Sequence, residues 1–106
     1  MSAPLQDNPT LADFQAYAAR KIKERGFDDE TVQDKFILLV EEVGELAKAL
    51  RPMHGVKVAD DSVVGDIEHE LADVFWLLLA LSNGLGVDLE QAVRAKEAKN
   101  EARSWS

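Results

Sequence analysis

The sequence contains no cysteine among its 106 residues. This absence excludes disulfide bonds, thiolate metal sites and cysteine nucleophiles together, so any chemistry of this chain relies on oxygen and nitrogen groups. Long apolar runs are missing too. The longest extends from Val74 to Leu81, far short of the roughly 20 residues that a membrane-spanning helix needs.

Basic residues are scarce, with 12 Lys and Arg against 20 Asp and Glu, and the formal net charge is −8. No run of Lys or Arg forms a long basic stripe, and a negative field repels the phosphates of duplex nucleic acid and of anionic membranes. Residues 1–9 lack the basic segment and apolar stretch of a secretory signal. We therefore expect a cytoplasmic protein that binds neither duplex nucleic acid nor membranes.

Strand-like alternation, low-complexity segments and repeats of fixed period are also absent, and helical periodicity dominates the chain. The pattern predicts one domain over residues 1–106 with four helices, at about residues 10–25, 31–50, 66–83 and 88–103. Thr10 and Asp88 are the expected N-caps, and Gly26 the expected stop of the first helix. Short connections between four helices favour an all-α, bundle-like architecture.

The third predicted helix is apolar on every side from Val74 to Leu81. A helix packed inside a monomer needs one apolar stripe, whereas a helix that is apolar all round must be covered all round. A chain of this length has few other elements to cover it, and exposed apolar patches are typical of interaction surfaces. The run therefore predicts a homodimer or homotetramer.

Each of the two central helices carries a pair of acidic residues. Glu42 and Glu45 are three positions apart on the second helix, as are Glu70 and Asp73 on the third, so each pair shares a helix face. An ordinary solvated surface is the simplest interpretation of such a pair. The residues in the same helix rows argue against it, because most of them are apolar. These row neighbours are Leu38 and Ala49 on the second helix, and Leu77 and Leu81 on the third.

If the two rows face each other, four carboxylates converge in a partly dry space, where repulsion and burial both raise their pKa values. Such a cluster needs a cation. Oxygen ligands without cysteine or paired histidines favour Mg²⁺, Mn²⁺ or Ca²⁺ over Zn²⁺, and the chain lacks the Asp/Asn-rich loop of an EF-hand. We therefore predict Mg²⁺, with Mn²⁺ as a possible substitute, and a substrate that bears phosphate.

The last predicted helix carries a row of polar residues at spacings of three, four and seven. The row consists of Lys96, Lys99, Asn100 and Arg103. Cations and an amide on one face can bind the phosphate oxygens that a metal leaves open. The alternative is a solvated basic face whose charge complements the C-terminal end of the helix dipole.

Two acidic motifs with a helix break between them resemble the signature of a known family. Glu41-Glu42-x-x-Glu45 and Glu70-x-x-Asp73 are similar to the E-E-x-x-E and E-x-x-D motifs of the MazG-type nucleotide pyrophosphohydrolases, in the all-α NTP pyrophosphatase superfamily. Residues 39–50 and 70–74 also follow the usual sequence of that family. The resemblance covers residues 14–103, and the combined motif is specific, whereas either half alone is weak.

The resemblance implies a four-helix MazG fold and an enzyme that hydrolyses a nucleoside triphosphate, often a deoxynucleotide, to the monophosphate and pyrophosphate with Mg²⁺. Such an activity suits house-cleaning of the nucleotide pool. Attack of water is expected at the α-phosphorus. A close alternative in the same superfamily is hydrolysis of phosphoribosyl-ATP. A further alternative is a non-catalytic regulatory or dimerisation module that keeps the acids for a structural ion.

The resemblance also assigns roles to individual residues. The implied metal ligands are Glu42, Glu45, Glu70 and Asp73. Glu41 matches the first acid of the motif and is implied to orient water or a second ion, and either Glu41 or Glu45 can accept the proton of the attacking water. The residues that match the phosphate-binding K-x-x-x-N-x-x-R stretch are Lys96, Asn100 and Arg103.

Several other residues have competing interpretations. His69 is expected at the surface or in packing, since a metal-binding side chain there points away from the Glu70 row. Phe75 and Trp76 can stack on a base, but their place in an apolar run favours packing in a core or an interface. Phe27 is a less specific candidate for contact with a base.

Overall fold

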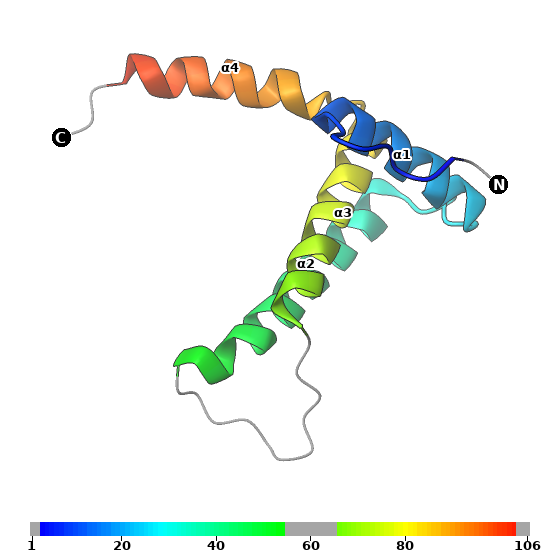
Figure 1. The fold of residues 1–106 in the computed structure, drawn as a ribbon, viewed down its shortest axis with the longest axis vertical. Coiled ribbons are helices and arrows are strands. Elements are labelled where there is room, and N and C mark those ends of the chain that lie inside the picture. The colour runs from blue at the N-terminus through cyan, green and yellow to red at the C-terminus, as the bar shows by residue number, and fades with distance from the viewer. Residues whose placement is uncertain (1–2, 55–65, 104–106) are drawn as a thin grey trace.

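The computed structural model describes residues 3–54 and 66–103, and in these ranges all regular elements are helices (Figure 1). They are α1 (Leu11–Glu24), α2 (Val32–Leu50), a short 3₁₀ helix η1 (Arg51–His54), α3 (Ile67–Leu85) and α4 (Leu89–Ala102). Their bounds agree with the four predicted helices to within two residues. The predicted all-α, four-helix fold is confirmed. The loop expected at residues 51–65 begins with η1, and its remainder lies outside the described residues.

Side-chain caps determine where the helices begin. At α1, the Thr10 hydroxyl accepts a hydrogen bond from the backbone N–H of Asp13, and the Asp13 carboxylate accepts one from the N–H of Thr10. Thr31 and Asp34 repeat this reciprocal arrangement at α2. The expected cap Asp88 accepts a backbone hydrogen bond at the start of α4. These contacts satisfy N–H groups that have no partner within the first turn of a helix.

Helices α2 and α3 run antiparallel, side by side, and α1 lies across the end where α2 begins and α3 ends (Figure 1). The best buried apolar side chains are Ala18 in α1 and Leu79 and Ala80 in α3, all at most 3% exposed. Small residues at this crossing let the two helices approach closely. The core therefore sits at one end of the α2–α3 pair and leaves the rest of that pair more open.

The chain turns sharply between α3 and α4. Gly86 ends α3 in the left-handed conformation with φ of +69°, which glycine adopts without steric cost. The two helices meet at 95°, and α4 then projects from the body with α1 as its main packing partner (Figure 1). No single helix in the described part of the chain is long and apolar enough to cross a bilayer, and α3 with α4 reaches that threshold only as this bent pair.

Apolar side chains form an open stripe on α2, on the side away from the acidic row. Phe36, Val40 and Val43 are each about half exposed, at 56%, 54% and 49%. On α3, the run that is apolar all round is also partly uncovered, since Phe75 and Leu78 remain 37% and 40% exposed. A single chain therefore leaves part of its strongest apolar surface without a partner.

Candidate functional site

The acidic rows of α2 and α3 face each other, as predicted. On α2, the row that contains Glu42 is turned toward α3, and its members Lys35 and Ala49 are only 7% and 4% exposed. Glu42, Glu70 and Asp73 each place one carboxylate oxygen within 4.8 Å of the others. Their local positions follow from helical spacing, because Glu70 and Asp73 lie one turn apart on the same face of α3.

The electrostatics of this group are unfavourable without a cation. The pKa of Glu42 is raised above its ordinary value, first by burial and then by the neighbouring charges of Asp73 and Glu70. The close approach of the Glu70 carboxylate, which favours a proton on Glu42, and the charge of Glu45 act in the same direction on this pKa. The Glu70 Oε2 atom is buried and has no hydrogen-bond partner among the described residues. A buried acceptor without a donor is costly.

Both features fit a bound divalent cation. Carboxylate oxygens are the ligands that Mg²⁺ and Mn²⁺ prefer, and oxygens this close can share one ion. An ion at this point would give Glu70 Oε2 its missing partner and would offset the repulsion that raises the pKa of Glu42. The chemistry of the donor set therefore agrees with the predicted cofactor.

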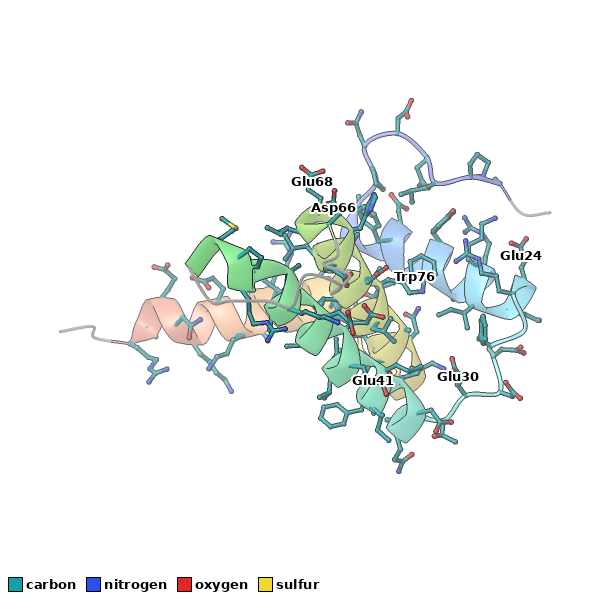
Figure 2. The ribbon with its side chains drawn as sticks, turned by 90° about the horizontal axis from the view of Figure 1, so that it is seen from below. Glu24, Glu30, Glu41, Asp66, Glu68 and Trp76 are labelled. Atoms are coloured by element: carbon teal, nitrogen blue, oxygen red, sulfur yellow. The ribbon has the colours of Figure 1, made fainter. Side chains whose placement is uncertain are left out.

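Glu45 and Glu41 lie at the edge of this group. Glu45 is exposed and is not one of the three acids whose oxygens converge, although its charge acts on Glu42. Glu41, which Figure 2 labels on α2, is also exposed and lies about 100° around the helix from Glu42. The structure thus brings together three of the four predicted ligands and leaves two glutamates at the solvent side.

The basic row on α4 lies apart from the acids within one chain. Lys96, Lys99 and Arg103 are exposed and Asn100 is half-buried, and α4 has no buried residue among those described. Because α4 turns away at 95° and packs mainly on α1, it carries the row away from the acids on α2 and α3 (Figure 1). One chain alone does not bring its own acidic and basic residues into one site.

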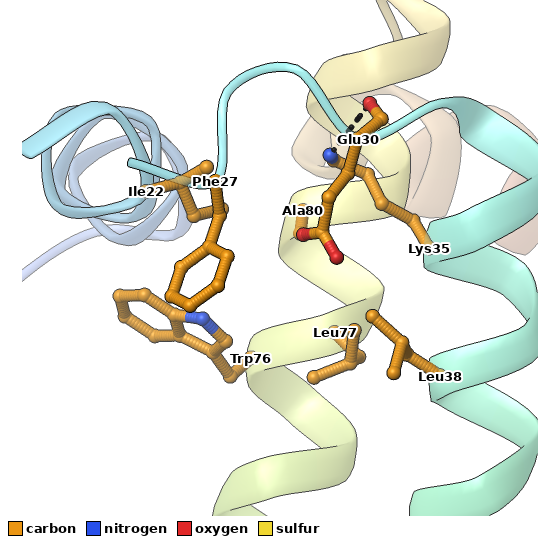
Figure 3. A pocket seen from close by; sticks show the side chains of 8 residues that line it. All are labelled: Ile22, Phe27, Glu30, Lys35, Leu38, Trp76, Leu77 and Ala80. Atoms are coloured by element: carbon orange, nitrogen blue, oxygen red, sulfur yellow. Dashed lines mark hydrogen bonds between the residues drawn. The ribbon is translucent and has the colours of Figure 1, made fainter. Parts of the chain in front are cut away.

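A pocket of about 300 Å³ lies beside the acids, between α1, α2 and α3 (Figure 3). Its walls are mainly apolar and come from all three helices and the α1–α2 connection. The lining residues are Ile22, Phe27, Glu30, Lys35, Leu38, Trp76, Leu77 and Ala80. Leu38 and Leu77 belong to the same rows as the acids, so the pocket lies next to the acids along α2 and α3.

Trp76, labelled in Figure 2, borders this pocket on the side of α1 (Figure 3). The sequence favoured packing for Trp76, and the structure shows both packing against Tyr17 and exposure to the pocket. His69 is exposed on the first turn of α3 and lies outside the three-acid group. Its surface placement agrees with the expectation.

Lys35 and Glu30 were not among the site residues predicted from the sequence, and both line this pocket. Lys35 lies seven positions before Glu42 and three before Leu38, so helical spacing places it in the same row. That spacing was the available signal. It was overlooked because Lys35 stands outside the acidic motif and a lysine on a helix is usually solvated.

The family of MazG nucleotide pyrophosphohydrolase domains matches residues 30–105. Among curated proteins, the chain is similar to a dATP/dGTP diphosphohydrolase of cyanophage S-2L, with 43% identity over 68 residues. That alignment covers 64% of this chain and 52% of the cyanophage protein. The chain thus spans about half the length of this relative.

Solved structures show the same fold. The YpjD protein of Bacillus subtilis is similar with a TM-score of 0.79 and 28% identity, over 93% of this chain and all of that one. The MazG-like pyrophosphohydrolase of cyanophage S-2L, bound to dGDP and three catalytic Mn²⁺ ions per active site, is similar with a TM-score of 0.69 and 35% identity. The likeness covers 92% of this chain and 87% of that one. The fold, the paired acidic motifs and the match over residues 30–105 agree, and the chain belongs to the MazG nucleotide pyrophosphohydrolase family.

Proposed function

We propose that this chain is a cytoplasmic, divalent-metal-dependent enzyme that hydrolyses a nucleoside or deoxynucleoside triphosphate to the monophosphate and pyrophosphate. The observation that carries the proposal is the group formed by Glu42, Glu70 and Asp73, with a buried Glu70 oxygen that lacks a partner. The activity named for the cyanophage relative, and the dGDP and Mn²⁺ in its structure, support the same chemistry.

The metal is held by Glu42, Glu70 and Asp73. Three ions per site, as in the cyanophage enzyme, need more oxygen ligands than three side chains offer, and Glu45 and Glu41 are the nearest further carboxylates along α2. A divalent cation, when bound, supplies positive charge for the triphosphate oxygens and makes nearby water more acidic. Either Mg²⁺ or Mn²⁺ suits this set of ligands.

The exposed glutamates Glu45 and Glu41 act on the attacking water. A water oxygen forms a bond to the α-phosphorus, the bond from that phosphorus to the bridging oxygen breaks, and pyrophosphate leaves with the bridging oxygen. Glu45 accepts the proton of the attacking water, because it lies at the edge of the group and is not needed as a partner for Glu70. Glu41 orients the water or a further ion.

The phosphate-binding row comes from another copy of the chain. Lys96, Lys99, Asn100 and Arg103 cannot be brought to the acids of their own chain without undoing the 95° corner. A projecting α4 is well placed to reach a neighbouring subunit, where its cations would bind the β- and γ-phosphates. The active site in this proposal is completed by two chains.

The exposed area supports self-association. The chain exposes 7923 Å², whereas a compact monomer of 11.7 kDa is expected to expose about 5,900 Å². Its radius of gyration is 16.8 Å, against about 13 Å for a compact domain of this length. The excess of about 2,000 Å² per chain is of the size that obligate homodimers bury. We therefore propose a homodimer or homotetramer. The open apolar stripe on α2 forms part of the interface between its chains.

Pyrophosphate release is the direct test. The purified protein is assayed with the four dNTPs, the four NTPs and phosphoribosyl-ATP, in Mg²⁺, in Mn²⁺ and in EDTA, while light scattering reports the mass in solution. We expect metal-dependent release from at least one nucleoside triphosphate, and an oligomer. Turnover of phosphoribosyl-ATP alone would support the alternative reaction. A lack of metal-dependent turnover on every substrate would favour the non-catalytic module, and a clean monomer would contradict the shared site.

A further inference from the structure

Two polar groups stand out in the otherwise apolar pocket beside the acids. Lys35 and Glu30 both line it, opposite the aromatic wall formed by Phe27 and Trp76 (Figure 3). In this view the Glu30 carboxylate lies in front of α3, beside Ala80, between the aromatic wall and Lys35. Apolar walls with a few placed polar groups are typical of sites that bind small molecules.

Lys35 is buried and is held by one hydrogen bond to the backbone. Its side chain is only 7% exposed, and its Nζ donates one hydrogen bond, of 3.1 Å, to the backbone oxygen of Glu30. No ion pair involves Lys35 among the described residues. An ammonium group has three donors, so two remain for a group that enters the pocket. A buried ammonium group needs hydrogen-bond acceptors for these donors, and the pocket gives water or a ligand access to them.

The aromatic wall is held in position by neighbouring side chains. The Tyr17 and Trp76 rings meet edge to face with centroids 6.1 Å apart. The Arg25 guanidinium lies 5.4 Å from the centroid of the Trp76 ring. A ring fixed in this way can stack on a planar base without losing side-chain freedom. The pocket thus combines a flat apolar wall with a cationic donor and a carboxylate acceptor.

The pocket begins where the metal site ends. Trp76 and Leu77 follow Asp73 by three and four positions, one turn along α3, and Leu38 precedes Glu42 by one turn on α2. Lys35 lies two turns from Glu42, about 10 Å along the helix. A nucleotide whose α-phosphate is at the acids can reach this depth with its sugar and base.

We propose that this pocket binds the base of the substrate and that Lys35 is a specificity-determining residue that selects purines with a carbonyl at C6, guanine or hypoxanthine, over adenine. The proposal rests on the proposed function, because it places the phosphates of the same nucleotide at the acids. A carbonyl oxygen accepts from the Lys35 ammonium, and the Glu30 carboxylate accepts from the N1–H and, in guanine, from the exocyclic amine. Adenine presents an amino donor to the ammonium and lacks the N1–H.

Base analogues test the proposal on the unaltered protein. Calorimetry in Mn²⁺ measures binding of the deoxynucleoside monophosphates of guanine, hypoxanthine, adenine and 2-aminopurine. Because monophosphates cannot release pyrophosphate, binding is measured without turnover. We expect guanine and hypoxanthine to bind about ten- to a hundredfold more tightly than adenine, the effect of one hydrogen bond to a charged donor. 2-Aminopurine, which lacks the carbonyl, should bind like adenine. Adenine or 2-aminopurine binding as tightly as guanine would overturn the proposal.

A matched pair of variants tests Lys35 itself. Lys35→Met keeps most of the side-chain length and removes the donors, and Lys23→Met makes the same change at an exposed position of α1 that does not line the pocket. We expect Lys35→Met to lower the affinity for the guanine nucleotide by about tenfold or more, leaving only the preference due to Glu30, with the adenine affinity unchanged. Lys23→Met should preserve the full preference. A folded Lys35→Met protein that keeps the full preference for guanine would overturn the assignment.

The readouts separate this proposal from the enzymatic one. If the guanine preference depends on Lys35 but no triphosphate is hydrolysed, the proposed function fails and the base-binding role stands. If triphosphates are hydrolysed without regard to the carbonyl, the enzymatic proposal stands and the role of Lys35 is wrong. If Lys35→Met does not fold, the analogue series on the unaltered protein decides.

Discussion

Gln15 and Asn83 exchange hydrogen bonds across the junction of α1 and α3. The Gln15 side-chain amide donates to Asn83 Oδ1 at 3.0 Å, and the Asn83 amide donates to the backbone oxygen of Gln15 at 2.9 Å. Gln15 also donates to the backbone oxygen of Val87 and accepts from the N–H of Leu89. Together these bonds attach the corner between α3 and α4 to α1 and so set the direction of α4.

Replacement of Gln15 by leucine should destabilise the protein by at least about 2 kcal/mol. Gln15 is 9% exposed, and the substitution removes the side-chain partners of the Val87 oxygen, the Leu89 N–H and Asn83 Oδ1, at about 1–3 kcal/mol for a buried group left unpaired. Urea unfolding measures the change. Gln33→Leu, at an exposed position of α2, is the control and should shift stability by less than about 0.5 kcal/mol. Equal effects of the two variants would contradict the role of Gln15.

Asp73→Asn and Glu45→Gln should differ in their effect on metal binding. Asp73 lies in the three-acid group, so its neutralisation should reduce turnover by at least about a hundredfold and weaken binding of the first ion. Glu45 lies at the edge, and Glu45→Gln should reduce turnover while the first ion still binds. Mn²⁺ titration by calorimetry, paired with the pyrophosphate assay, separates the two. If Glu45→Gln also fails to bind the first ion, Glu45 is a ligand of that ion, as Asp73 is, and its placement at the edge is wrong.

The stability of the metal-free protein should rise as the pH falls from neutrality. Because the pKa of Glu42 is raised in the folded state, the folded chain binds more protons than the unfolded chain between the ordinary pKa, about 4.3, and the raised one. Stability is therefore lost as pH rises through this window. The pKa of Asp13 is lowered by the Thr10 backbone and side-chain hydrogen bonds, so its contribution is lost only at lower pH.

Thermal unfolding in EDTA, at neutral pH and at about pH 5, measures this effect. We expect the melting temperature to increase by a few degrees at the lower pH, and the increase to shrink in Glu42→Gln, which cannot ionise. Saturating Mg²⁺ at neutral pH should produce a similar stabilisation. A melting temperature that falls equally in both proteins on acidification would contradict the assignment to Glu42.

Two inactive variants should restore activity to each other if the site is shared. Asp73→Asn removes a metal ligand but keeps the basic row, and the double variant Lys96→Ala with Arg103→Ala does the reverse. A mixed dimer then holds one intact site and one doubly impaired site. Co-refolded in equal amounts, the chains should recover about a quarter of the wild-type turnover, because half of the dimers are mixed and each has one working site. No recovery would place the basic row in its own chain.

Helix positions and the acidic rows could be predicted from sequence because both depend on local spacing. Glu42, Glu70 and Asp73 converge since Leu38 and Leu77 in their rows turn those faces inward. The direction of α4 could not be predicted, because it depends on Gln15 and Asn83, which are 68 positions apart. Lys35 was missed for a similar reason, since its burial depends on the packing of α3 against α2.

Because α4 projects from the corner at Gly86, a rotation at the corner moves the far end of the helix most. With 14 residues, the helix is about 21 Å long, so a rotation of about 10° at the corner displaces its far end by about 4 Å, more than the length of a hydrogen bond. A small rotation of α4, permitted by weaker hydrogen bonds at Gln15, would thus produce a larger displacement at Arg103. The position of the Arg103 guanidinium is therefore set at the corner between α3 and α4, far from any phosphate that this residue binds.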